Sequence, residues 1–126
     1  RKQQFRHRVL ANGYVDSVHE LMEIATAIIT KPGGLTTAEA LAKRTPLLMV
    51  APIPGQEMCN ARYLLSQGAA VQVSSVATIG DIVTQLFREP DRLNQLRKKA
   101  EALAHPDSAL QIGRLLLDLG DRFLHQ

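Results

Sequence analysis

Short apolar runs alternate along the chain with longer stretches in which apolar residues recur at helical spacing. The runs lie at residues 27–30, 46–50 and 69–73. A continuous apolar run of this length, with β-branched members, is typical of a strand that other elements cover on both faces. The pattern therefore predicts three strands, of which the first two are buried on both faces.

Helices are predicted where apolar residues share one face behind a capping residue. Asp16 and Ser17 are good N-cap residues, and the apolar positions that follow them predict a helix over residues 17–26. Gly68 is suited to the left-handed position just after a helix that begins at about Glu57. The predicted helices after the first lie at residues 37–43, 57–66, 76–88, 91–103 and 108–124.

The order of these elements predicts an α/β fold. Residues 8–15 mix apolar side chains with a glycine, and we interpret them as a further short strand. Strands that alternate with helices form a parallel sheet, so we expect a Rossmann-like sheet with flanking helices in one domain over residues 1–126. Ligands of such sheets bind outside the carboxyl ends of the strands, from which the loops at residues 14–17, 31–36 and 51–57 leave.

Composition agrees with a folded α/β domain. Hydrophobic residues make up 45% of the 126 positions and aromatic residues only 4%, so the core is aliphatic and a disordered chain is excluded. No apolar run approaches the roughly 20 residues of a membrane span, and no signal peptide is visible. Since the chain opens without a methionine, we expect it to be part of a longer protein.

Positive charge gathers at the start of the chain, although the net charge is only +3. Arg1, Lys2, Arg6 and Arg8 form either a solvated tail or a segment attracted to an anionic membrane surface. Aromatic residues are too few to stack bases along a nucleic-acid strand, so we expect no nucleic-acid partner. The single cysteine, Cys59, excludes an intrachain disulfide and is interpreted as a small buried residue.

The stretch TKPGGLTTAEA, at residues 30–40, follows the first apolar run. Its paired glycines, Gly33 and Gly34, let the backbone approach a ligand closely, and free N–H groups at a helix start attract an anion. The spacing matches neither of the standard glycine-rich nucleotide motifs, so a phosphate loop and a simple tight turn both remain open. Glu39 has two interpretations as well: a capping box with Thr36, or a ligand for sugar hydroxyls.

The second loop, PIPGQE, leads from the next strand into a helix. Gln56, Glu57 and Asn60 place carboxylate and amide groups within five positions, which suits a polyhydroxylated ligand. Loop hydrogen bonding and helix capping are the alternative explanation for the same residues. His19 is interpreted as an exposed helix residue rather than a catalyst, and no serine-hydrolase or zinc motif is present.

Residues 13–71, with TKPGG, the T-x-x-E-A pattern, PGQE and GAA in this order, resemble the C-terminal nucleotide-sugar domain of GT-B glycosyltransferases. The closest resemblance is to the group of monogalactosyldiacylglycerol synthases and processive diacylglycerol glucosyltransferases, in glycosyltransferase family 28. The combination of motifs is specific to that group, whereas each motif alone is not. The resemblance implies the donor-binding half of a two-domain enzyme, whose first strands and glycine-rich loop lie upstream of this chain.

The resemblance also implies roles for individual residues. Tyr14 and Val15 match the loop that contacts the uracil, Glu39 matches the acid that binds the ribose, and no residue here is implied as catalytic. The remaining matches are to the diphosphate loop, at Gly33, Gly34, Leu35 and Thr36, and to the donor-hexose contacts, at Gln56 and Glu57 with Asn60 close behind.

The implied activity is inverting transfer of a hexose from a UDP-sugar, without metal or other cofactor. The acceptor is expected to be a lipid such as diacylglycerol, bound by the other domain at the cytoplasmic face of a membrane, so this chain alone is expected to be inactive. Two alternatives stay open. One is a transferase for another acceptor, such as a lipid-linked peptidoglycan precursor, and the other is a non-catalytic nucleotide-binding module.

Overall fold

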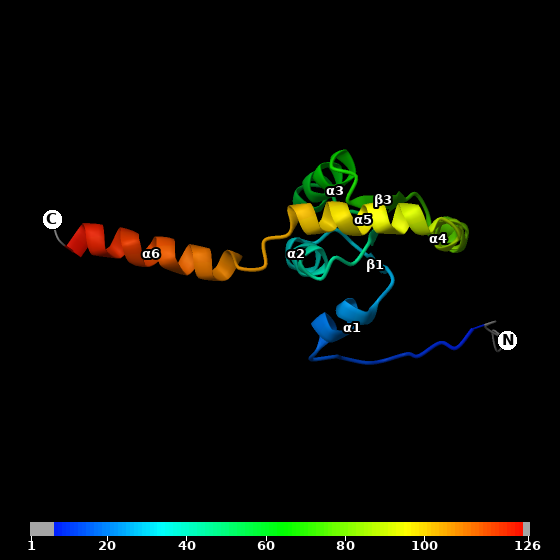
Figure 1. The fold of residues 1–126 in the computed structure, drawn as a ribbon. Coiled ribbons are helices and arrows are strands. Elements are labelled where there is room, and N and C mark those ends of the chain that lie inside the picture. Colours follow the sequence, from blue (N-terminus) through cyan, green and yellow to red (C-terminus); the bar gives the residue numbers. More distant parts are fainter. Residues whose placement is uncertain (1–6, 125–126) are drawn as a thin grey trace.

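A three-stranded parallel sheet forms the centre of the computed structural model, which describes residues 7–124 (Figure 1). Its strands are β1 (Ile28–Thr30), β2 (Leu47–Val50) and β3 (Ala70–Val73), in the order β1-β2-β3. Leu47 of β2 is paired with Ile28 on one side and with Ala70 on the other. Because the strands are parallel, the loops that follow them leave from one common edge.

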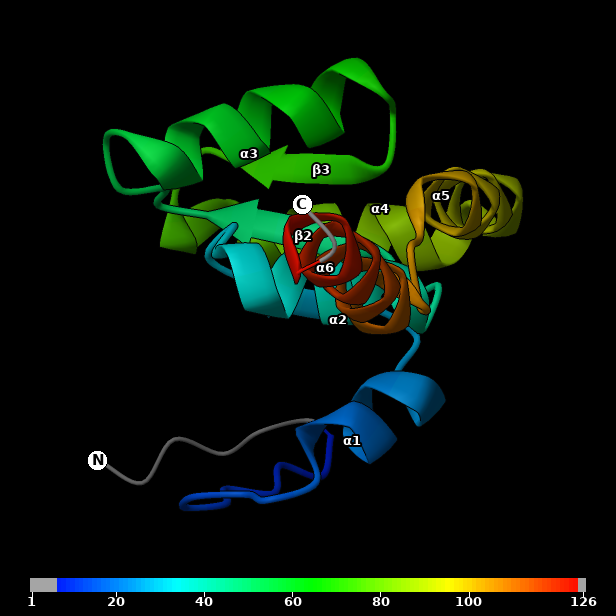
Figure 2. The same cartoon turned by 90° about the vertical axis from the view of Figure 1, so that its left-hand side faces the viewer.

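Helices pack on both faces of this sheet. The face that carries Leu47 and Met49 packs with α2 (Gly34–Ala42) and α3 (Gln56–Ser66), while Leu48 points to the opposite face. That opposite face packs with α4 (Ile79–Arg88) and α5 (Pro90–Leu103). Figure 2 shows α3 running beside β3. The alternation of neighbouring residues between two cores is the two-residue period of a strand covered on both sides.

Local sequence explains several element boundaries. Gly68 lies just beyond α3 at a φ of +67°, in the left-handed region that a glycine adopts without strain. Pro90 opens α5 at the first helical position, where its missing N–H costs no hydrogen bond. A short 3-10 turn, η1 (Val76–Thr78), leads into α4.

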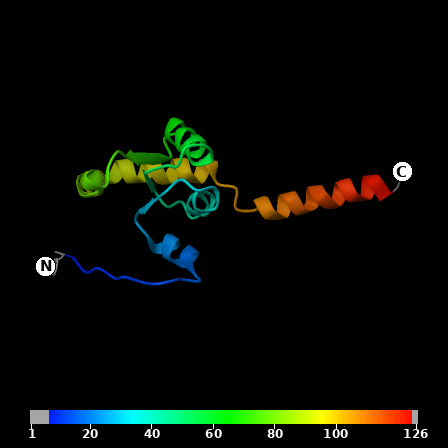
Figure 3. The ribbon, with the colours of Figure 1, turned by 180° about the vertical axis from the view of Figure 1, so that it is seen from behind.

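Two helices lie at the periphery of the fold. The first, α1 (Val18–Ile24), packs toward α2 through Met22, which is 2% exposed. The last, α6 (Ser108–Leu124), extends away from the remaining elements, as Figures 1 and 3 show from opposite sides. Apolar side chains of α6 are exposed, among them those of Leu116 at 63% and Phe123 at 77%. The core that supports the strand edge is therefore built by β1–β3 and α2–α5, to which α1 adds Met22.

The predicted α/β fold is confirmed, with three corrections. Residues 8–15 form no strand, because no neighbouring strand within residues 7–124 pairs with them. The strand β1 is not buried on both faces; it lies at the sheet edge, where Ile29 is 44% exposed. The helix predicted from residue 37 already begins at Gly34, since both that glycine and the residues after it adopt helical geometry.

Candidate functional site

A pocket of about 490 Å³ lies beside the carboxyl end of β1, between the start of α1 and the first turns of α2. We call it the α1–α2 pocket. Tyr14, Val15 and Asp16 line it from the loop before α1, and Thr36 and Glu39 line it from α2. Residues about 20 positions apart in sequence thus share one cavity at the edge where parallel sheets bind ligands. Its volume falls within the roughly 300–1,000 Å³ that is usual for small-molecule sites.

Glu39 is an exposed carboxylate on the α2 wall of this pocket. The capping box expected between Thr36 and Glu39 is wrong. The helix begins three residues earlier, with Gly33 as its N-cap, so Thr36 lies inside the first turn and not at the cap position. The free protein therefore does not use Glu39 to cap α2, and the carboxylate is available to a ligand without first leaving a cap.

The start of α2 presents backbone donors beside the pocket. The first hydrogen bond of the helix runs from the N–H of Thr37 to the carbonyl of Gly33, over 2.9 Å. By helix geometry, the N–H groups of Gly34, Leu35 and Thr36 then have no acceptor within the helix. Leu35 is 84% exposed, so this turn faces outward. Unpaired N–H groups and the positive end of the helix dipole together favour an anion here.

The loop before α3 uses its polar side chains differently. The Glu57 carboxylate accepts a hydrogen bond of 2.8 Å from the N–H of Ile53 and thereby closes its own loop. The Asn60 amide donates over 3.0 Å to the carbonyl of Pro32, in the first loop. Gln56 remains exposed. Of the three residues matched to the donor hexose, two thus have structural roles in the free protein, which sequence spacing alone did not distinguish from ligand binding.

Asp16 and His19 also line the α1–α2 pocket, although the resemblance assigns them no role. His19 is exposed on α1, as expected from the sequence. Their proximity to Glu39 follows from how α1 packs against α2. The sequence signal that could have found them is their place in the loop at residues 14–17 and the turn after it, at the ligand edge.

Two polar contacts hold α1 beside α2. Lys43 Nζ lies 2.6 Å from the Glu23 carboxylate, and this hydrogen bond and charge lower the pKa of Glu23 below its ordinary value of 4.5. The hydroxyl of Thr45, which is 2% exposed, donates over 2.7 Å to the carbonyl of Met22. These contacts join the second half of α1, whose Met22 lines the pocket, to the end of α2 and the segment that follows it.

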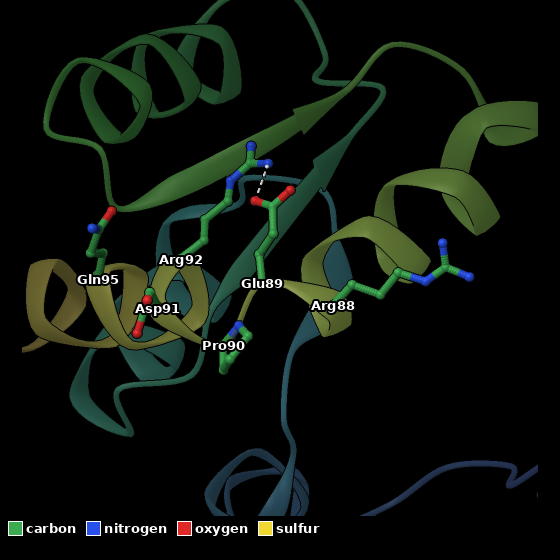
Figure 4. A pocket seen from close by; sticks show the side chains of 6 residues that line it. All are labelled: Arg88, Glu89, Pro90, Asp91, Arg92 and Gln95. Atoms are coloured by element: carbon green, nitrogen blue, oxygen red, sulfur yellow. Dashed lines mark hydrogen bonds and ion pairs between the residues drawn. The ribbon is translucent and has the colours of Figure 1, made fainter.

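A second cavity, of about 550 Å³, lies at the junction of α4 and α5. Figure 4 shows Arg92 turned toward Glu89, with 3.5 Å between their charged groups, while Arg88 points the other way. Its lining comes from one helix junction, and it includes neither a strand end nor a residue of the two loops. We therefore take the α1–α2 pocket as the candidate functional site.

Two further expectations concern single residues and the membrane. Cys59 is exposed, so its interpretation as a buried residue is wrong; it lies on the outer side of α3.

In the described part of the chain, no three side chains of the metal-binding types cluster as a metal site would require. Among the same residues, no helix has the length and apolar character to cross a membrane. The basic residues Arg1, Lys2 and Arg6 lie outside the described residues.

Comparison with known proteins gives consistent matches. The model of the glycosyltransferase family 28 C-terminal domain matches residues 2–112. The processive diacylglycerol beta-glucosyltransferase of Bacillus cytotoxicus is 35% identical over 106 residues, which is 84% of this chain and 27% of that protein. The protein of the same name from Bacillus subtilis (strain 168) is 40% identical over 91 residues, or 72% of this chain and 24% of the relative. The chain thus spans about a quarter of the length of these curated relatives.

Proposed function

This chain belongs to the glycosyltransferase family 28 C-terminal domains, and from that premise we propose that it is the donor-binding half of a hexosyltransferase. The donor is a UDP-hexose, and the acceptor is a lipid such as diacylglycerol. Transfer proceeds with inversion and without a metal ion. The names of the similar Bacillus proteins support the choice of a glycerolipid acceptor over a lipid-linked peptidoglycan precursor.

One observation supports this proposal most: the α1–α2 pocket joins the loop at Tyr14 and Val15 to the carboxylate of Glu39. In the proposal, the backbone of the loop contacts the uracil. The carboxylate accepts hydrogen bonds from both ribose hydroxyls, a pairing that suits two acceptor oxygens facing two donors. The start of α2, next to the pocket, then receives the diphosphate.

The chemical contribution of this domain is to stabilise the leaving group. Negative charge grows on the β-phosphate as the bond to the sugar breaks. The N–H groups of Gly34, Leu35 and Thr36 and the dipole of α2 face that charge and stabilise it more than they stabilise the bound donor. The domain thereby supplies the electrostatic stabilisation that a metal ion supplies in other phosphate sites.

The sugar lies toward the second loop. Gln56, exposed in the first turn of α3, contacts hexose hydroxyls, and Glu57 joins it once its bond to the Ile53 N–H is exchanged for the sugar. The catalytic base and the acceptor site belong to the other domain, so this chain alone binds UDP weakly and transfers nothing. The whole enzyme acts from the cytoplasmic side, peripherally at a membrane surface.

Titration of the isotope-labelled chain with UDP tests the nucleotide site, because NMR chemical shifts report weak binding residue by residue. We expect shifts in residues 14–16 and 33–36. Glu39→Ala is expected to weaken UDP binding at least about tenfold, since charge-assisted hydrogen bonds contribute roughly 1.5–3 kcal/mol each. Glu20→Ala, which removes an exposed acid from α1 outside the pocket, is the control and retains full affinity.

Unchanged UDP affinity in Glu39→Ala would refute the ribose assignment. Absence of any UDP-induced shift would refute the donor-binding function itself. The acceptor is tested with the intact enzyme and labelled UDP-glucose, UDP-galactose or UDP-N-acetylglucosamine, offered vesicles of diacylglycerol or of lipid-linked peptidoglycan precursor. Labelled product from the peptidoglycan precursor alone would favour the alternative acceptor, and no product from either would favour a non-catalytic nucleotide-binding module.

A further inference from the structure

One side chain connects the two loops that the proposed function places on either side of the diphosphate. Asn60 Nδ2, in the second turn of α3, donates a 3.0 Å hydrogen bond to the carbonyl oxygen of Pro32, 28 residues earlier. Pro32 directly precedes the paired glycines and is itself fully buried. The hydrogen bond therefore reaches the backbone of the loop that leads directly into the first turn of α2.

The orientation of the Asn60 amide follows from this partner. A carbonyl oxygen only accepts, so the amide must present its nitrogen to Pro32. One N–H of the Asn60 amide is then used within the protein, and the half-buried position of the side chain shields this bond from competing water. A bond of this kind differs from the direct sugar contact that the resemblance suggests for this position.

The start of α2 and the facing side of α3 leave a space between them, although the two helices share one apolar core. A cavity of about 130 Å³ lies between the two helices, lined by Gly34 and Thr37 from α2 and by Asn60 and Tyr63 from α3. The Thr37 hydroxyl beside it is buried and has no hydrogen-bond partner within residues 7–124. Beside this space, the Asn60–Pro32 hydrogen bond links α3 to the loop before α2.

We propose that Asn60 is a positioning residue, which holds the diphosphate loop in its binding geometry from the helix that carries the sugar contacts. This inference rests on the proposed function and extends it. Gln56 lies one helical turn before Asn60 on the same face of α3. In this proposal, α3 binds the hexose at Gln56 and the start of α2 binds the diphosphate at Gly34. The Asn60–Pro32 hydrogen bond holds these two elements in a fixed relative position.

The two roles for Asn60 differ in which ligand a substitution affects. A direct sugar contact predicts that Asn60→Ala weakens binding of UDP-glucose and leaves binding of UDP, which has no sugar on its β-phosphate, unchanged. A positioning role predicts that both ligands lose affinity by the same factor. We expect about a tenfold loss for each, the usual effect of removing one half-buried hydrogen bond.

The experiment titrates the isotope-labelled chain with UDP and with UDP-glucose, in the wild type, Asn60→Ala and Gln56→Ala. The last variant is the matched control: it shortens an amide in the preceding turn of the same helix, and it is expected to weaken UDP-glucose binding alone. Amide shifts of residues 32–36 in unliganded Asn60→Ala report whether the loop has moved, and the remaining spectrum reports whether the fold is retained.

Equal losses for UDP and UDP-glucose in Asn60→Ala, with shifted resonances at residues 32–36, are the expected result. A loss confined to UDP-glucose, or wild-type affinity for both ligands, would overturn the positioning role and leave the donor-binding function intact. If Asn60→Ala unfolds, Asn60→Asp, which keeps the shape but cannot donate when ionised, is compared with Asn60→Gln, which restores a donor. Higher UDP affinity in the glutamine variant supports the inference, and equal affinities refute it. Failure of wild-type UDP binding would instead refute the proposed function.

Discussion

The two glycine-containing loops at the strand edge look alike in sequence and differ in conformation. Gly33, in the first loop, has a φ of −66°, and neither Gly33 nor Gly34 adopts the left-handed region. Gly55, in the second loop, has a φ of +102° and a ψ of −127°, which side-chain-bearing residues rarely adopt. The turn itself thus requires Gly55, whereas the backbone of the free protein requires neither glycine of the first loop.

This difference indicates what each glycine is for. A Cβ built on Gly33 or Gly34 meets no atom within 4 Å, so packing does not demand a glycine there either. Gly33 is the N-cap of α2, a position that glycine favours, and close approach of the diphosphate in the proposed function is a further physical reason for the pair. The polar groups that follow the two loops differ as well. After the first loop, the Glu39 carboxylate lines the pocket and the first N–H groups of α2 have no acceptor within the helix. After the second loop, Glu57 and Asn60 of α3 form internal hydrogen bonds.

Gly55→Ala is expected to have the largest effect on stability. An alanine at this φ and ψ is strained, and we expect a loss of about 2 kcal/mol in the free energy of unfolding, measured by urea titration. Gly80→Ala in α4 is the control, because that glycine lies in a helix with open space at its Cβ position and no positive φ. A loss no larger than in the control would remove the contrast between the loops.

Gly34→Ala is expected to act in the opposite direction on stability. The glycine occupies the first helical position of α2, where alanine stabilises the folded state by about 0.5–1 kcal/mol. Its Cβ tilts toward the helix N-terminus, where the diphosphate binds in the proposed function, so UDP affinity is expected to fall. A stabilised variant with unchanged UDP affinity, measured in the same titration as the wild type, would show that the paired glycines do not serve the ligand.

Glu23→Gln is expected to have the smallest effect on stability. It tests the contact between α1, which lines the pocket beside the first loop, and Lys43 at the end of α2. The Lys43 contact lowers the pKa of Glu23, so its stabilisation is fully present above pH 4.5 and is lost as pH falls through the lowered value. The unfolding midpoint of the variant should therefore lie slightly below that of the wild type at neutral pH and approach it in acid. A gap that persists in acid would exclude the ion pair as its cause.

Much of the fold could be predicted because it depends on local patterns. Runs such as residues 46–50 are long enough and apolar enough to identify buried strands, and Gly68 and Pro90 mark helix boundaries through backbone geometry. Residues 8–15 were predicted wrongly because a strand needs a neighbour to satisfy its N–H and C=O groups, and no pattern within the segment reveals whether one exists. The exposure of Ile29 has the same origin, since it depends on what lies beside β1.

The candidate site divides in the same manner. Sequence spacing identified the residues on the two loops, but it left each polar side chain with both a structural and a ligand-binding interpretation. The structure shows that Glu39 does not take part in capping α2, since the helix begins at Gly34 with Gly33 as its N-cap. It also gives Asn60 a hydrogen-bond partner 28 residues away. Neither result follows from the local sequence pattern. The first depends on the residue at which α2 begins in the fold, and the second depends on the loop before α2 lying beside α3.

The sequence by itself determined the α/β class, the order of the elements from α1 onward, and the common edge at which the loops after the parallel strands lie, since these follow from periodicity and from the geometry of parallel strands. Only the tertiary structure decided which polar groups on that edge stay free. A hydrogen bond between distant residues, such as that from Asn60 to Pro32, uses one donor at this edge and leaves others free. The packing of α1 against α2 then assembles the remaining groups around Glu39 into one pocket.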